Sequence, residues 1–155
     1  MDDKLNDDWR EFLSLMISKR VKFLVLGGHA VSVHAHPRVT EDLDVFVEVS
    51  APNARRLRSV LVDFGLGESA PTVEELATEG KVFMIGVPPW RIDILTKISG
   101  VRFETAWKNR VRLRLAVGTI NVISRRDLIR NKRASGRAKD LADLVALRAS
   151  STRVK

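Results

Sequence analysis

The sequence contains no cysteine. A disulfide framework and a thiol nucleophile are therefore excluded, and nothing in the composition argues for export. The apolar stretches are too short and too often interrupted to span a bilayer, and the acidic start Met1-Asp2-Asp3 is unlike a signal peptide. We therefore expect a cytoplasmic protein that does not bind membranes.

The size and composition of the chain suit one globular domain. Of its 155 residues, 45% are hydrophobic and 30% are charged. This is enough to bury a core, with little room for anything else. We predict a single domain over residues 1–148 and a loose, flexible tail over residues 149–155.

Charge is distributed unevenly along the chain. Residues 1–96 carry 11 Lys and Arg against 15 Asp and Glu, whereas residues 97–155 carry 16 against 4. A basic C-terminal third can attract a nucleoside triphosphate or RNA, because both are polyanions. A solvated basic surface explains the same composition equally well.

A pair of glycines follows the first strongly apolar segment. Residues 21–26 read as a short buried strand, and Gly27 and Gly28 then let the backbone turn sharply and come close to a ligand. A helix is predicted to start near His29 and to end near Ala35, before Pro37. The unpaired N–H groups and positive dipole end of a helix start favour a phosphate.

Three aspartates lie on two predicted strands. Asp42 and Asp44 alternate with apolar residues over 42–49, so their side chains share one face. Two such close carboxylates repel each other unless a cation neutralises them, which favours a divalent metal such as magnesium. Asp93 lies between Ile92 and Ile94, where a charge is costly unless it is paired or bound to metal. We predict a joint metal site rather than unrelated strand-end acids.

The remaining segments supply the support for these motifs. A first helix, capped by Asn6 or Asp7, carries an apolar stripe, and two strands are predicted to form a hairpin around Pro88-Pro89. The other expected elements are a helix from Ser50 to about Phe64, a short helix with a Thr72–Glu75 capping box, a short helix around 103–107, strands 111–115 and 120–123, and a last helical region from Ser124 that is broken at Gly136. In that last region Leu141, Leu144 and Val145 are expected to face inward.

Several polar residues near the glycine turn allow two interpretations. His29, His34 and His36 fall within eight positions, but zinc is the less favoured interpretation because no cysteine or further histidine completes a set. We expect His29 to line the phosphate turn and His34 to pack within its helix. Arg38 either contacts phosphate or pairs with Glu41 or Asp42 to order the loop, and Thr40 bonds either the loop backbone or a phosphate oxygen.

In order and spacing these motifs resemble a known superfamily. Gly27-Gly28, Asp42-x-Asp44 and a later Asp93 between apolar residues resemble the signature of the DNA polymerase beta-type nucleotidyltransferases. Arg38-x-Thr40-x-Asp42-x-Asp44 and residues 132–144 (KRASGRAKDLADL) are similar to the abortive-infection (AbiEii-type) nucleotidyltransferases, some of which are toxins. The resemblance runs from about Val21 to Leu147. It implies an α/β (α+β) fold with a mixed central sheet and helices packed against it.

The resemblance also implies a chemical role for each motif. The residues expected to bind the nucleoside triphosphate, or to order that site, are Gly27, Gly28, His29, Arg38, Thr40, Lys132 and Asp140. Two Mg²⁺ ions would bind Asp42, Asp44 and Asp93, which would be the catalytic acids. A nucleoside monophosphate would pass from an NTP to an acceptor hydroxyl, with release of pyrophosphate. The acceptor stays open among an RNA or tRNA end, a protein and a small molecule, and a partner protein or a homodimer would complete the site.

Two other function classes use the same residues. A non-catalytic module that binds nucleotide or RNA, for example within a toxin–antitoxin system, would bind without turnover. Such a module has no reason to keep three costly acids together. A metal-dependent phosphohydrolase would need the same carboxylates but would release inorganic phosphate instead of pyrophosphate.

Overall fold

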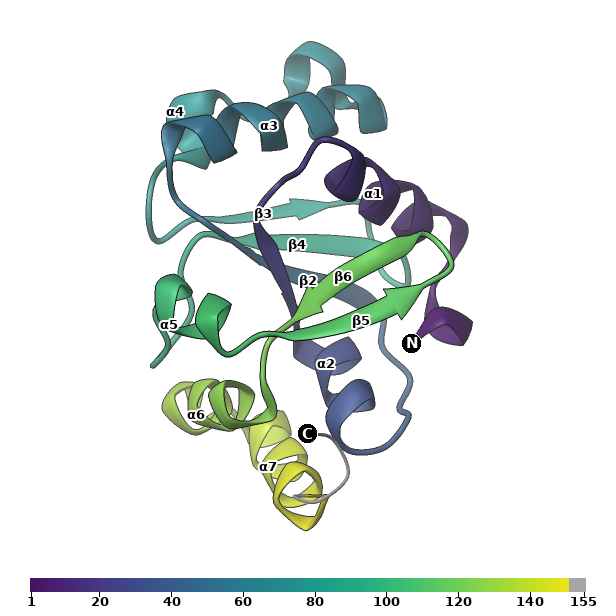
Figure 1. Ribbon diagram of the computed structural model, residues 1–155, viewed down its shortest axis with the longest axis vertical. Helices are drawn as coiled ribbons and strands as arrows, with labels where there is room; N and C mark the ends of the chain where they lie inside the picture. The colour runs from purple at the N-terminus through teal and green to yellow at the C-terminus, as the bar shows by residue number, and fades with distance from the viewer. Residues whose placement is uncertain (151–155) are drawn as a thin grey trace.

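A computed structural model describes residues 1–150, and its centre is a six-stranded mixed sheet in the order β3-β4-β2-β1-β6-β5 (Figure 1). The strands are β1 (Phe23–Leu26), β2 (Asp42–Val47), β3 (Val82–Ile85), β4 (Arg91–Leu95), β5 (Val111–Leu115) and β6 (Gly118–Val122). The β2–β4 and β1–β6 pairs are parallel, and the other pairs are antiparallel. The predicted α/β fold with a mixed central sheet is confirmed.

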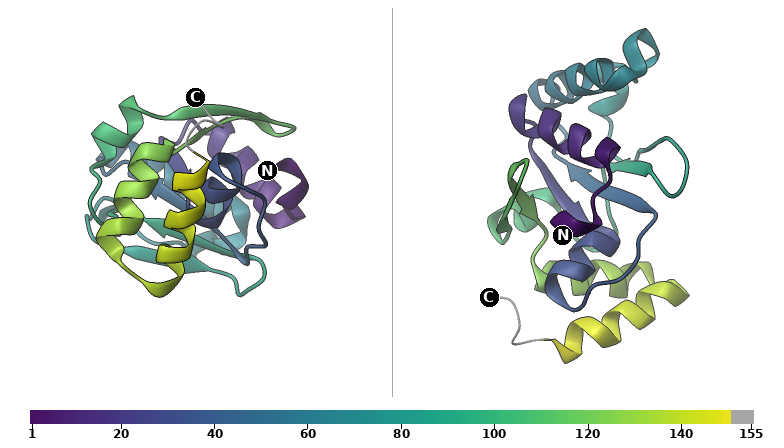
Figure 2. Two further views of the ribbon diagram at one scale, coloured as in Figure 1. Left: turned by 90° about the horizontal axis from the view of Figure 1, so that it is seen from below. Right: turned by 90° about the vertical axis from the view of Figure 1, so that its right-hand side faces the viewer.

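The helices pack around this sheet. They are α1 (Asp7–Ser18), α2 (Gly27–His34), α3 (Ala51–Leu61), α4 (Val73–Leu76), α5 (Phe103–Lys108), α6 (Arg125–Ser135) and α7 (Ala138–Ala149). In Figure 1, α3 and α4 lie at one end of the molecule and α6 and α7 at the other. The left view of Figure 2 shows α6 and α7 side by side. No helix in residues 1–150 has the length and apolar character needed to cross a membrane.

Local capping bonds set where several helices begin and end. Asn6 accepts a hydrogen bond from the backbone N–H of Trp9, and Ser50 and Ser124 cap α3 and α6 in the same way. The Thr72–Glu75 capping box is formed in both directions. Each bond satisfies a backbone N–H that a helix start leaves unpaired. These sequence signals therefore fixed their helix starts correctly.

The apolar stripe of α1 packs into the core. Phe12, Leu13 and Met16 are fully buried, and the ring of Phe12 meets that of Phe64 edge to face at 5.6 Å. The indole N–H of Trp9 donates to the carbonyl oxygens of residues 90 and 91, each at 3.2 Å. Helix α1 therefore also holds the start of β4, the strand that carries Asp93.

Helix α7 departs from the sequence prediction. Leu144 is buried as expected, but Leu141 and Val145 are 56% and 70% exposed, so their predicted inward orientation is wrong. The inward face is shared by two acids, Asp140 and Asp143, which are buried beside Lys132. Because these ion pairs fix the rotation of the helix, two of its apolar residues turn outward.

Some element boundaries also differ. The amide of Val21 bonds to the carbonyl of Met16 and closes α1, so β1 starts only at Phe23. Helix α2 already begins at Gly27, and β6 at Gly118. Helix α7 extends to Ala149, the first residue of the predicted tail, and residues 151–155 lie outside the described part of the chain.

Candidate active site

The parallel pairing of β2 and β4 brings the three predicted acids together. In this register Asp44 lies opposite Asp93, and Asp42 lies opposite Arg91. Asp42 and Asp44 are two residues apart and therefore project from the same face of β2. Carboxylate oxygens of Asp42, Asp44 and Asp93 lie within 4.8 Å of one another. Acids separated by about a third of the chain thus form one cluster.

Close packing of the three acids perturbs their ionisation. Burial, followed by the neighbouring charges of Asp42 and Asp93, raises the pKa of the Asp44 carboxyl to about 7. Like charges at this separation resist joint ionisation. A set of three oxygen ligands with this mutual repulsion fits a hard divalent cation such as Mg²⁺. Within residues 1–150 this is the one group of three such side chains with metal-binding spacing.

Arg91 is the site residue that sequence reasoning missed. Its Nη2 lies 2.9 Å from Oδ2 of Asp42 and 3.1 Å from Oδ2 of Asp93, and its Nε lies 2.9 Å from Oδ1 of Asp93. The guanidinium therefore engages both oxygens of Asp93. Strand alternation was the available signal, because residues 91 and 93 must share a face. The contact of Arg91 with Asp42 could not be predicted from the sequence, because it depends on the register between β2 and β4.

The two glycines allow the start of α2 to approach β2 and the following loop. Gly27 has φ +66°, and a Cβ there would lie only 2.0 Å from Oδ2 of Asp44. A Cβ on Gly28 would lie 2.9 Å from the hydroxyl of Thr40 and 3.1 Å from Nη2 of Arg38. The sequence predicted a close approach at this turn. What approaches Gly27 in the structure is the carboxylate of Asp44.

Lys132 lies within a buried ion-pair network at the junction of α6 and α7. Its Nζ is 3.2 Å from Asp140 and 2.9 Å from Asp143. Arg137 pairs with Asp140 at 2.9 Å, and Arg38 pairs with Asp143 at 3.2 Å. Gly136, in a left-handed conformation, makes the sharp turn between the helices that this network requires. The network holds three cations against two carboxylates.

Asp140 is ionised within this network. Burial alone would raise the pKa of its carboxyl, but hydrogen bonds from Ser135, Arg137 and Lys132 outweigh burial and bring the pKa well below its ordinary value. The carboxylate itself is fully buried. Asp140 therefore orients Lys132 and does not itself reach the cavity.

A cavity of about 450 Å³ opens beside the acid cluster. Acids on β2 and β4 form one side of it. Five cationic side chains also line it: Arg91, which lies among the acids, and Lys97, Lys132, Arg137 and Lys139. Apolar side chains of β3 and β4 complete the lining. Acids that can hold a metal and cations that can hold phosphate oxygens thus face a common space.

The other predicted nucleotide ligands occupy different positions. His29 is fully buried against Trp9, with its ring 5.0 Å away edge to face, so the structure does not place it at the cavity wall. Burial lowers the pKa of His29 to about 4 and keeps the ring neutral. The reason is that α2 begins two residues earlier than predicted, which turns residue 29 inward. The hydroxyl of Thr40 donates to the backbone oxygen of Asp42 at 3.0 Å. For Thr40, the bond to the loop backbone is the alternative that is seen. Arg38 pairs with Asp143 at 3.2 Å, and not with Glu41 or Asp42 as the sequence suggested.

The histidines do not gather into a metal site. Nε2 of the buried His34 donates to the carbonyl of Ile123 at 2.7 Å, because a carbonyl oxygen can only accept. Burial lowers the pKa of His34. His36 is exposed and bonds the adjacent carbonyl of Pro37. The packing role predicted for His34 agrees with this geometry.

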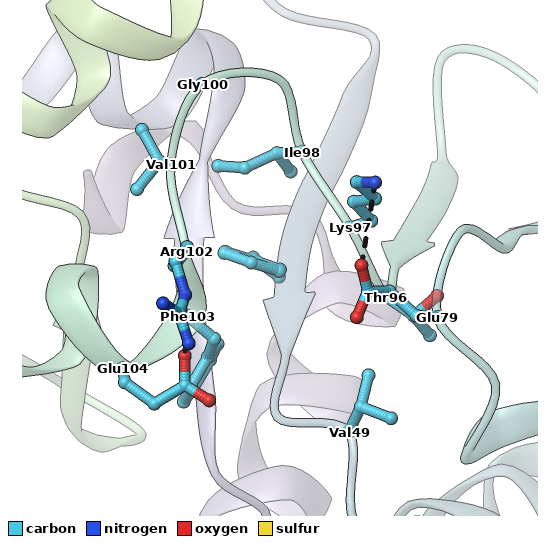
Figure 3. A pocket seen from close by; sticks show the side chains of 11 residues that line it. Val49, Glu79, Thr96, Lys97, Ile98, Gly100, Val101, Arg102, Phe103 and Glu104 are labelled. Carbon is cyan, nitrogen blue, oxygen red and sulfur yellow. Dashed lines mark ion pairs between the residues drawn. The ribbon is translucent and has the colours of Figure 1, made fainter.

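A second cavity of about 390 Å³ adjoins the first and shares Lys97 and Ile98 with it. Figure 3 shows this second cavity, with the apolar side chains of Val49, Ile98, Val101 and Phe103 around it. Two ion pairs lie at its edge, Lys97–Glu79 at 3.5 Å and Arg102–Glu104 at 3.9 Å. All four charged side chains are largely exposed, so solvent screens both pairs.

Comparison with known proteins agrees with this architecture. The fold is similar to the crystal structure of an antigenic nucleotidyltransferase-like protein from Paracoccidioides brasiliensis, with a TM-score of 0.56 and 15% identity over 92% of this chain and 77% of that chain. At this identity the similarity concerns the fold alone. The sequence matches no curated protein. Residues 7–151 match the model of a family described as "Nucleotidyltransferase of unknown function (DUF6036)". Because that match covers nearly the whole chain, the chain belongs to this nucleotidyltransferase family.

Proposed function

We propose that this protein transfers a nucleoside monophosphate from a nucleoside triphosphate to an acceptor hydroxyl, with a divalent metal bound by Asp42, Asp44 and Asp93. One observation carries the proposal: three carboxylates within 4.8 Å of one another line a cavity that five cationic side chains also line. Bound Mg²⁺ supplies charge neutralisation and Lewis acidity at the reacting phosphate. The donor set fits this ion, because all three ligands are carboxylate oxygens.

The chain's own residues bind and orient the substrate. Lys132, held between two carboxylates with little freedom to move, presents its ammonium to the β- and γ-phosphates, and Arg137 and Lys139 extend this positive wall. Arg91 contacts both oxygens of Asp93, so its guanidinium would have to shift where a metal takes the same lone pairs. The freed guanidinium then lies beside the phosphates, where it offsets their charge.

The transfer reaction forms one P–O bond and breaks another. The acceptor oxygen attacks the α-phosphorus and forms a new P–O bond, and the bond from that phosphorus to the bridging oxygen of the β-phosphate breaks. Pyrophosphate leaves with the bonding electrons. Asp93, one of the three carboxylates that line the cavity, accepts the hydroxyl proton.

The decisive experiment compares Asp42→Asn and Asp44→Asn with the wild type. The proteins are incubated with α-labelled nucleoside triphosphates, Mg²⁺, total RNA and a protein extract, and both pyrophosphate and labelled products are measured. We expect wild-type transfer and a loss of at least about 10³-fold in both variants. Asp8→Asn, at an exposed acid far from the cavity in sequence, is the matched control and should transfer normally.

The rival functions give different results in the same assay. A binding-only module retains nucleotide but releases nothing, and a phosphohydrolase releases inorganic phosphate. Undiminished pyrophosphate release by both variants would refute the role of the acids. The finer assignment to the abortive-infection type, and any part in a toxin–antitoxin system, rests on the residue resemblance alone.

A further inference from the structure

Exposed apolar side chains concentrate on one hairpin. Of the seven large hydrophobic residues that are strongly exposed within residues 1–150, four lie on β3 or in the β3–β4 turn: Val82, Met84, Val87 and Trp90, between 51% and 68% exposed. The right-hand view of Figure 2 shows this turn extending away from the body of the protein. Single exposed hydrophobic residues are common on protein surfaces, whereas a cluster of them is typical of a surface that contacts another molecule.

Strand β3 is also an open edge of the sheet. It pairs with β4 alone, and it stands at the end of the strand order. The carbonyl of Lys81 accepts a bond from the amide of Thr96 on the β4 side. By alternation, Phe83 and Ile85 direct their backbone groups toward β4, whereas Val82 and Met84 direct theirs away from the sheet. Strand β3 itself contains neither a charged residue nor a proline, which commonly protect such edges.

The open edge borders the catalytic cavity. The side chains of Val82 and Met84 line the same cavity as the three acids. The pairings Asp44–Asp93 and Asp93–Met84 form one continuous row across β2, β4 and β3. A strand added next to β3 would continue this row, and its alternate side chains would lie on the cavity side.

We propose that β3 is a docking strand for an extended segment of an acceptor polypeptide, whose serine, threonine or tyrosine hydroxyl receives the nucleotidyl group. The identification of the acceptor rests on the proposed function. The outward N–H and C=O groups of Val82 and Met84 repeat at the spacing of another β-strand, so an extended polypeptide is the ligand that matches them. Its apolar residues cover Val82 and Met84.

A second copy of this chain is the less suitable occupant. In this chain residues 79–91, which comprise β3 and the stretches on either side of it, contain no Ser, Thr or Tyr, so a second copy paired through β3 offers no hydroxyl next to the paired segment. A different polypeptide can combine apolar anchors with a hydroxyl. The added strand lies two strand spacings, about 10 Å, from β4. The hydroxyl therefore belongs to a residue beyond the paired segment, where the acceptor turns into the cavity. The hydroxyl oxygen bonds to the α-phosphorus and gives its proton to Asp93, and pyrophosphate leaves.

Proline at position 84 tests the docking strand directly. Met84→Pro removes an outward N–H but no β3–β4 hydrogen bond, so an edge strand tolerates it. Met84→Ala keeps the N–H and removes the side chain. Leu141→Ala, which removes a similarly exposed apolar side chain from α7, is the matched control. The probe is a phage-displayed library of linear peptides containing Ser, Thr and Tyr, selected on the full-length protein and then synthesised.

We expect selected peptides with alternating apolar residues. Their affinity should fall by about tenfold or more in Met84→Pro, less in Met84→Ala, and not in Leu141→Ala. On the wild type, the amides of Val82 and Met84 should gain protection from hydrogen exchange when the peptide binds, a readout that does not depend on the folding of any variant. With a labelled nucleoside triphosphate and Mg²⁺, the peptide should acquire label on its hydroxyl.

The possible failures separate the two proposals. Peptides that bind without protecting these amides, or equally well to Met84→Pro, would overturn the docking strand. If sedimentation shows reversible dimerisation of the wild type and Met84→Pro abolishes it, the occupant of β3 is a second copy of the chain, and the proposed acceptor polypeptide is overturned. Transfer to RNA or to a small molecule but to no docked peptide would overturn the polypeptide acceptor while leaving nucleotidyl transfer intact. Absence of transfer to every acceptor would count against the proposed function itself.

Discussion

Replacing Arg91 by methionine removes the one cation within residues 1–150 that contacts two of the three cavity acids directly. In the structure its guanidinium lies within 2.9–3.1 Å of Asp42 and Asp93. A charge pair about 4 Å apart is worth about 4 kcal/mol at an effective dielectric constant of 20. The side chains of Arg91 and Asp42 are 29% and 24% exposed, so screening reduces the net loss. We expect Arg91→Met to destabilise the metal-free protein by about 1–3 kcal/mol.

Mg²⁺ should reverse the loss of stability in Arg91→Met. Mg²⁺ bound by the three acids neutralises them in place of Arg91, so the destabilisation should shrink toward zero at saturating Mg²⁺. By linkage, the difference between the two conditions equals the gain in metal affinity. A difference of 1–3 kcal/mol corresponds to a Kd that is about 5- to 150-fold lower in the variant.

Two measurements check this prediction. Urea unfolding at pH 8 with and without Mg²⁺ gives the two stabilities, and titration calorimetry with Mg²⁺ gives the affinity. Arg102→Met is the control, because Arg102 is 85% exposed and its partner Glu104 lies outside the acid cluster. Equal destabilisation with and without Mg²⁺, together with an unchanged Kd, would show that Arg91 and the metal do not compete.

Three further perturbations follow from the same site. Gly27→Ala should lower the free energy of unfolding by about 2 kcal/mol or more and weaken Mg²⁺ binding, because its Cβ would displace the Asp44 carboxylate. In urea unfolding, Gly80→Ala is the control for backbone strain alone, because Gly80 also has positive φ but has open space around it. Lys132→Met should cost about 3–5 kcal/mol by leaving buried Asp140 and Asp143 without their ammonium, and an unaltered unfolding midpoint would contradict this. The folded-state pKa of Asp44 is about 7, above its ordinary 3.8, so the folded protein keeps a proton that the unfolded chain releases. Metal-free stability should therefore fall between about pH 4 and pH 7, by on the order of 2–4 kcal/mol, and calorimetry of Asp44→Asn should show a flatter profile.

Much of the fold follows from local signals in the sequence. Asn6, Ser50 and Ser124 fixed helix starts because capping involves only neighbouring residues. The alternation of polar and apolar residues correctly placed Asp42 and Asp44 on one face of a strand, because it too depends only on neighbouring residues. Helix α7 shows the limit of such patterns. Its apolar residues looked core-facing, but the buried Asp140 and Asp143 took the inward face, because a lysine on another helix neutralises them.

Local patterns along the chain identify the residues that can carry the chemistry, namely three acids on strands, a glycine turn and a basic C-terminal third. Which of these residues meet depends on how distant segments pack. The parallel β2–β4 register places Asp93 beside Asp44 and brings Arg91 to Asp42, whereas His29 turns into the core. Register and helix rotation depend on the packing of distant segments, so they cannot be read from local spacing.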